Sequence, residues 1–147
     1  MEITKRKFNT KRADSGSLTF LEGEKDIPFA VRRIYYIYDL ANGAHRGFHA
    51  HKALHQYLIC VHGSCKVLLD DGRQREIVLL DNPGEGLYVG PDTWREMYSF
   101  SPEAVLLVLA SEYYDENDYI RNYDLFLNYM KEKDFAKNYN ENQEMGK

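Results

Sequence analysis

Short runs of hydrophobic or alternating residues, separated by turn residues, recur between residues 16 and 110. A series of short strands with turn signals between them is typical of an antiparallel sandwich or barrel. The pattern predicts strands within residues 17–23, 29–39, 55–63, 64–72, 73–84, 86–91, 93–100 and 103–110. Most of this chain is therefore expected to fold as an all-β domain.

The pattern changes after Ala110, where hydrophobic residues begin to recur at helical spacing. This spacing predicts a C-terminal α-helix over residues 117–131, capped by Asp115 or Asn117. The hydrophobic residues that show it are Tyr119, Ile120, Tyr123, Phe126, Leu127 and Met130. Residues 136–147 are polar and are expected to form a frayed tail. The whole chain, 1–147, is expected to be one domain with its core in residues 16–112.

Composition narrows the class of protein. With 147 residues, 44% of them hydrophobic, the chain suits one compact domain. The net charge of −4 does not suggest nucleic-acid binding, although a local basic pocket for a small phosphate ligand stays open. No run of apolar residues is long enough for a membrane span or a signal peptide, so we expect a soluble, cytoplasmic protein. Cys60 and Cys65 flank a predicted turn, and reduced core cysteines are favoured over a hairpin disulfide.

The chemistry begins in the stretch RGFHAHKALHQYLICVHGSC, residues 46–65. Alternate side chains of a strand share a face, so His49 and His51 are expected to project into one space. Such a pair of imidazoles can serve as metal ligands or as a proton-transfer pair.

The metal hypothesis can be tested against the first motif of metal-binding cupins, G-x5-H-x-H-x3-4-E-x6-G. Its spacing fits Gly43, His49, His51 and Gly63, but Gln56 stands at the carboxylate position. The second motif maps to GLYVGPDTWREM, where Arg95 stands at the last histidine. A guanidinium has no lone pair for a metal, and an amide is a poor substitute for a carboxylate.

Two of the four usual ligands are thus absent, which favours proton transfer and predicts no metal. His55 has the strand parity of His49 and His51, so a metal site completed by His55 stays open as an alternative.

Four segments together resemble the dTDP-4-keto-6-deoxyglucose 3,4-ketoisomerases, the WxcM-like sugar-nucleotide cupins. They are RRIYYIYD, RGFHAHKALHQYLICVHGSCKVLLDDG, GLYVGPDTWREM and VLASEYYDENDYIRNYDLF, and the likeness runs from about residue 16 to 129. Two positions depart from the family pattern: Ser15 stands at a usual arginine and Arg95 at a common histidine. The resemblance leaves the C4 configuration of the product open.

This resemblance implies a cupin jelly roll that moves the keto group of a dTDP-linked 4-keto-6-deoxy sugar from C4 to C3. The product would be aminated later, for 3-amino sugars of surface polysaccharides. Such enzymes need no metal or redox cofactor, and they form homodimers that exchange an N-terminal strand.

Within that reaction we expect His51 to act as the base at carbon and His49 to move protons at oxygen, although the sequence leaves their order open. Strand parity places Tyr35 beside Arg33, so Tyr35 is the candidate oxygen donor, with core filling as the alternative. The expected substrate-binding residues are cations for the diphosphate, aromatic residues for the rings and two polar neighbours: Arg33, Arg46, Arg95, Tyr88, Trp94, Tyr98, Gln56 and Glu96.

Three other functions remain as alternatives. A sugar-nucleotide 3,5-epimerase is also a metal-free cupin, but it pairs one histidine with an aspartate, and the H-x-H arrangement argues against it. A sugar-binding cupin without catalysis would bind the nucleotide sugar without exchanging its C3 proton. A metal-dependent dioxygenase or isomerase would contain stoichiometric metal.

Overall fold

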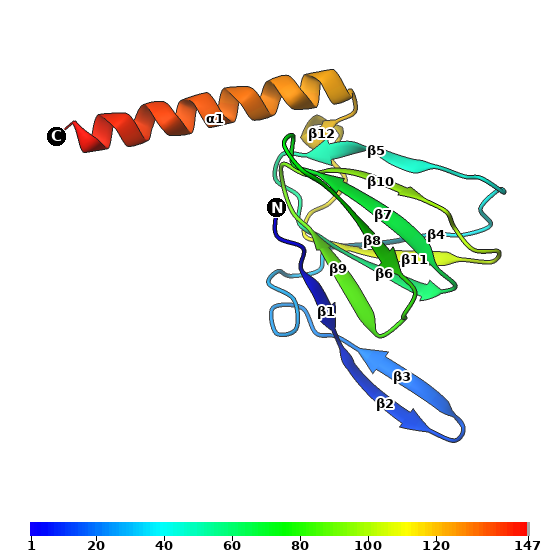
Figure 1. Cartoon of the computed structure of the whole chain (residues 1–147). Helices are drawn as coiled ribbons and strands as arrows, with labels where there is room; N and C mark the ends of the chain where they lie inside the picture. Colours follow the sequence, from blue (N-terminus) through cyan, green and yellow to red (C-terminus); the bar gives the residue numbers. More distant parts are fainter. Residues whose placement is uncertain (147) are drawn as a thin grey trace.

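The computed structural model, described here for residues 1–146, is a jelly roll of two facing five-stranded sheets (Figure 1). The first sheet has the order β1 (Lys5–Lys7), β9 (Glu85–Val89), β6 (Gln56–His62), β11 (Val105–Ala110) and β4 (Arg33–Ile37). The second has the order β12 (Tyr119–Ile120), β5 (Arg46–His51), β10 (Trp94–Tyr98), β7 (Cys65–Asp70) and β8 (Arg75–Leu80). Every strand pair is antiparallel, which confirms the predicted all-β class.

The space between the sheets holds the main core, because each inner strand alternates hydrophobic residues toward it. Leu58 and Cys60 of β6, Val67 and Leu69 of β7 and Val108 of β11 are buried there. Cys60 and Cys65 are both free and buried, in agreement with the expectation of reduced core cysteines.

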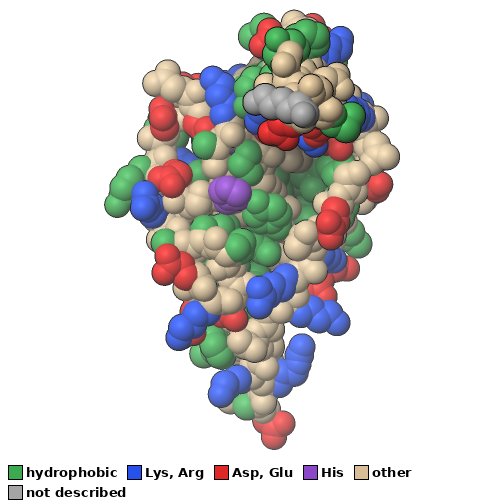
Figure 2. Space-filling view, turned by 90° about the vertical axis from the view of Figure 1, so that its left-hand side faces the viewer, with side chains coloured by type: hydrophobic (Ala, Val, Ile, Leu, Met, Phe, Trp, Pro, Cys, Tyr) green, Lys and Arg blue, Asp and Glu red, His purple; other side chains and the backbone are tan. Residues whose placement is uncertain are grey.

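A hairpin of β2 (Asn9–Ala13) and β3 (Gly16–Phe20) extends away from the sandwich as a separate two-stranded sheet (Figure 1). Figure 2 shows it as a narrow projection flanked by Lys and Arg side chains, with hydrophobic side chains gathered on the body above it. The sequence pattern did not predict β1 or β2, because KRK and NTKRA contain no alternating hydrophobic residues.

The C-terminal helix α1 runs from Tyr123 to Met145, so it begins and ends later than the predicted 117–131. Residues 116–118 form instead a 3-10 turn capped by Asp115, and Tyr119 and Ile120 form β12. The side chain of Asn122 accepts a hydrogen bond from the Leu125 N–H and starts α1. The predicted polar tail is helical up to Met145 and projects from the body (Figure 1).

Phe126 anchors the first turns of α1 against Trp94 and Ile120. Over residues 1–146, no helix is both long enough and apolar enough to cross a membrane.

Candidate active site

His49 and His51 lie side by side at the end of β5, with ring centroids 4.9 Å apart and the rings nearly perpendicular. A bulge precedes them: opposite β10, Phe48 has no partner between Gly47 and His49. Gly47 adopts a φ of +92°, and a Cβ there would lie 2.7 Å from the Arg95 carbonyl oxygen. Glycine is therefore required at position 47 for β5 to approach β10 closely.

The His51 ring is buried and held by Asp118 from the 3-10 turn. Its Nδ1 lies 3.0 Å from Asp118 Oδ2, while Asp118 Oδ1 accepts a hydrogen bond from the Ala53 N–H at 2.8 Å. A carboxylate accepts, so Nδ1 carries the proton and the lone pair lies on Nε2. His51 Nε2 is buried and has no partner within residues 1–146.

His49 has the same tautomer for a similar reason. Its Nδ1 lies 3.1 Å from the Gly47 carbonyl oxygen, which can only accept a hydrogen bond. The Nε2 atom of His49 thus carries a lone pair. The Tyr119 ring lies against both imidazoles, with centroids 5.0 Å from His49 and 4.2 Å from His51.

Burial, followed by the positive charge of Arg95, lowers the pKa of His49 to about 4 and the pKa of His51 to about 2. Both rings are therefore neutral at pH 7, as two proton acceptors must be. Burial also raises the pKa of Tyr35, which stays a protonated phenol.

Arg95 and Gln56 lie beneath the histidines, each 1% exposed. Arg95 Nη1 donates to Gln56 Oε1 at 2.5 Å, and Gln56 Nε2 donates to the Tyr35 hydroxyl at 3.1 Å. Arg95 is directly opposite His49 in the ladder between β5 and β10. Gln56 and Arg95, the two residues that depart from the metal motif, are thus hydrogen-bonded to each other.

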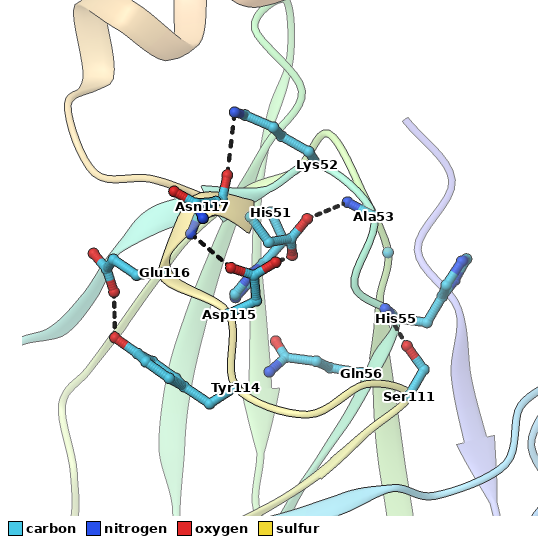
Figure 3. Close-up of polar contacts among 12 residues, drawn as sticks. His51, Lys52, Ala53, His55, Gln56, Ser111, Tyr114, Asp115, Glu116 and Asn117 are labelled. Atoms are coloured by element: carbon cyan, nitrogen blue, oxygen red, sulfur yellow. Dashed lines mark hydrogen bonds and ion pairs between the residues drawn. The ribbon is translucent and has the colours of Figure 1, made fainter.

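Two neighbouring cavities reach the histidine pair. One, of about 330 Å³, touches His49 and is lined by three arginines, Arg33, Arg46 and Arg121, with Tyr35 and Tyr119. The other, of about 290 Å³, touches His51 and contains Asp118, Asp115, Tyr114, Arg33 and Tyr119. Figure 3 shows the segment from Tyr114 to Asn117 bordering His51, with Tyr114 bonded to Glu116 and Asp115 bonded to Asn117.

Arg33 and Tyr119 line both cavities and so stand between them. The Nε atom of Arg33 is buried without a partner in the part of the chain that the structure describes. Parity in β4 is as predicted: Arg33, Tyr35 and Ile37 are partly buried, whereas Ile34 and Tyr36 are exposed.

The other expected binding residues lie outside both cavities. Trp94, Glu96 and Tyr98 alternate with the inward-facing Arg95 and Met97 along β10, so strand parity directs them to the opposite face. Trp94 Nε1 donates to Glu96, Glu96 is paired with His45 at 3.1 Å, and Tyr98 stacks on His45.

Tyr88 lies on β9, where its hydroxyl is 2.5 Å from His55 Nδ1. Within residues 1–146 no three His, Cys, Asp or Glu side chains are grouped in a way that could hold a metal ion.

Sequence reasoning missed Asp118, Tyr119 and Arg121. All three lie in the segment VLASEYYDENDYIRNYDLF, where the helical spacing predicts a helix from residue 117, whereas the structure has β12, which pairs Tyr119 with His51. Arg121 lies over the Tyr119 ring at 4.1 Å and pairs with Glu116 through two nitrogens. His51 and Asp118 form a histidine–aspartate pair, which is the arrangement that the 3,5-epimerase alternative uses.

Comparisons with known proteins agree with this geometry. A family model described as "FdtA: WxcM-like, C-terminal" matches residues 1–131. A TDP-4-oxo-6-deoxy-alpha-D-glucose-3,4-oxoisomerase from Aneurinibacillus thermoaerophilus is 55% identical over 115 residues, which are 78% of this chain and 83% of that protein.

Two solved structures are similar throughout the domain. One is a histidine-to-asparagine variant of the 3,4-ketoisomerase QdtA from Thermoanaerobacterium thermosaccharolyticum with TDP-4-keto-6-deoxyglucose, at TM-score 0.86 and 48% identity, covering 88% of this chain and 94% of that one. The other is a 3,4-ketoisomerase from Helicobacter canadensis, at TM-score 0.86 and 49% identity, covering 89% and 98%.

Proposed function

This chain belongs to the FdtA, WxcM-like family, and on that premise we propose that it is a dTDP-sugar 3,4-ketoisomerase. Its substrate would be dTDP-4-keto-6-deoxyglucose, and the keto group would move from C4 to C3. The observation that carries the proposal is the pair of neutral imidazoles whose Nε2 atoms are both free, one of them held by Asp118.

The reaction needs one acceptor at carbon and one at oxygen. His51 Nε2 removes the C3 proton, the C3–H electron pair forms a C3=C4 bond, and the C4 carbonyl oxygen gains the electrons of its π bond. Tyr35 donates its hydroxyl proton toward that oxygen as charge develops there. His49 then takes the proton of the C3 hydroxyl as the new C3 carbonyl forms, and the protonated His51 delivers a proton to C4. The proton held by His49 returns to Tyr35, so that all three side chains recover their starting states.

Asp118 supports His51 as the carbon base. It keeps the proton on Nδ1 and stabilises the imidazolium that forms when Nε2 accepts a proton. The bound diphosphate adds negative charge near both rings, which makes them stronger bases than they are in the free protein.

The diphosphate would occupy the arginine-lined cavity beside His49. Arg33, Arg46 and Arg121 approach it from three different segments of the chain. Guanidinium groups match phosphate oxygens with paired donors, and the unpartnered Nε of Arg33 offers one more.

The proposed activity is tested by proton NMR of dTDP-4-keto-6-deoxyglucose with purified, chelator-treated protein in deuterated buffer. A 3-keto product with deuterium at C4 is expected, and His51→Asn should abolish it while nucleotide binding persists. Exchange at C3 and C5 without keto migration would indicate the 3,5-epimerase, to which the His51–Asp118 pair gives new weight. Binding without exchange would indicate a sensor.

The protein is also proposed to act as a homodimer through its N-terminal hairpin. A two-stranded hairpin is barely stable alone, yet β2 and β3 leave the body with Leu18 and Phe20 exposed. A hollow of about 530 Å³ separates this hairpin from β6 and β11. The outer face of β4 exposes Ile34 and Tyr36 as well. Sedimentation should give a dimer, and Leu18→Asp should weaken it; a monomeric wild type would contradict the proposal.

A further inference from the structure

The hydrogen bonds beneath the histidines run in a fixed direction. Arg95 has only donors, and all three of its guanidinium nitrogens are used: Nε on the Thr93 carbonyl oxygen, Nη1 on Gln56 Oε1, and Nη2 on the carbonyl oxygens of Thr93 and Gly90. None of these acceptors is a carboxylate. A buried cation that is not hydrogen-bonded to a carboxylate is costly, so its presence here calls for a reason beyond packing.

Arg95 donates a hydrogen bond to the Gln56 amide, which in turn donates one to Tyr35. Because the guanidinium can only donate, the Gln56 oxygen must face Arg95 and the amide NH2 must face Tyr35. The Tyr35 oxygen is then an acceptor from Gln56. Its own proton has to point elsewhere, and within residues 1–146 no protein acceptor receives it.

We propose that Gln56 and Arg95 are positioning residues that hold Tyr35 as a hydrogen-bond donor into the active site. Tyr35 lines the arginine-rich cavity beside His49, where its free O–H can meet the substrate oxygen. Gln56 and Arg95 line neither cavity and act through Tyr35. This inference rests on the proposed ketoisomerase function, whose enediolate oxygen the phenol would meet.

One substitution can reverse the direction of the hydrogen bond between residue 56 and Tyr35. In Gln56→Glu, the new carboxylate pairs with Arg95 but has no N–H for Tyr35, so the Tyr35 proton turns toward it and is lost to the substrate. The added ion pair should preserve the fold, which a thermal melt will check. Gln143→Glu, on the exposed part of α1, makes the same change of charge far from the site.

Turnover of dTDP-4-keto-6-deoxyglucose should separate positioning from packing. Gln56→Glu and Tyr35→Phe are each expected to lower kcat about 100-fold, with KM within about 2-fold. The double variant Gln56→Glu/Tyr35→Phe should be no slower than Tyr35→Phe alone, because both changes remove one donor. Gln143→Glu should match the wild type.

A second readout does not depend on turnover. With 3-fluorotyrosine placed at position 35, fluorine NMR follows the titration of that phenol in the free protein. Gln56→Glu should raise its pKa, because a carboxylate replaces an N–H donor beside the phenolate. An unchanged pKa, an unchanged kcat, or losses that multiply in the double variant would each overturn the proposal. An inactive wild type would overturn the proposed function and with it the catalytic role, while the fluorine titration would still decide the hydrogen-bond direction.

Discussion

The buried histidine pair should make the protein sensitive to mild acid. In the unfolded chain both imidazoles titrate near their ordinary pKa of 6.5, whereas in the native state His49 titrates near 4 and His51 near 2. Between the ordinary pKa and the native pKa of His49, the unfolded chain binds up to two more protons than the native protein, and below that range only His51 differs. The free energy of unfolding must therefore fall as the pH is lowered through this window.

The size of the effect follows from the same shifts. Between pH 7.5 and pH 5.0, each histidine that is protonated only when unfolded contributes a loss of ~2 kcal/mol, so the pair contributes ~4 kcal/mol. The total stability of a domain of this size is commonly about 5–15 kcal/mol, so the loss is easily measured. Carboxylates with lowered pKa, such as Glu116, affect stability mainly below this range.

Urea unfolding at pH 7.5, 6.0 and 5.0 provides the assay. Trp94 is the single tryptophan and is buried against Tyr123 and Phe126, so its fluorescence reports the sheet and the helix together. His49→Asn and His51→Asn should each remove about half of the dependence on pH, because asparagine does not titrate.

A wild-type loss below ~1 kcal/mol would refute the reasoning, since both rings would then be protonated in the native state. A loss near 2 kcal/mol would limit the shift to one histidine. In that case, one of the two asparagine variants would show the same loss of unfolding free energy as the wild type. The histidine replaced in that variant is the ring that is charged in the native state.

Three further predictions concern the site and α1. Asp118→Asn should lower kcat about 100-fold with little change in KM, because an amide that donates to His51 Nδ1 moves the imidazole proton to Nε2. Single-turnover kinetics will measure the loss, and a normal kcat would contradict the role of Asp118 in holding His51. Arg121→Ala and Arg46→Ala should raise KM for the nucleotide sugar at least 10-fold, and an unchanged saturation curve would remove either residue from the diphosphate site. Ending the chain after Asp134 should change the free energy of unfolding by less than ~1 kcal/mol and leave kcat/KM unchanged, because the removed part of α1 is exposed; urea unfolding and steady-state kinetics will test it.

The sequence predicted those features that depend on local alternation. Most strands of the sandwich, the shared face of His49 and His51, and the inward direction of Arg33 and Tyr35 follow from a period of two residues. The same rule, applied to residues 94–98, places the Arg95 side chain on one face of β10 and the side chains of Trp94, Glu96 and Tyr98 on the other.

What the sequence did not predict depends on contacts distant along the chain. A strand of two residues has no recognisable period, and β12 exists because Tyr119 and Ile120 pair with β5 almost seventy positions earlier. The role of Asp118 follows from that pairing, which brings the 3-10 turn to His51. Helical spacing from Tyr119 to Met130 concealed this turn, although Asn122 is a suitable cap for a later start.

Gln56 and Arg95 change the chemistry of the site without changing its framework. In the metal cupin motif these two positions supply a carboxylate and a histidine. Here Arg95 Nη1 lies 2.5 Å from Gln56 Oε1, beneath the pair formed by His49 and His51. The substitution puts a permanent positive charge, fixed by carbonyl oxygens, close to where negative charge would develop on the substrate. Burial and, after it, the same charge lower the pKa of His49 and His51, which keeps them available as proton acceptors. One buried guanidinium thus favours both the neutral bases of the ground state and the enediolate of the proposed reaction.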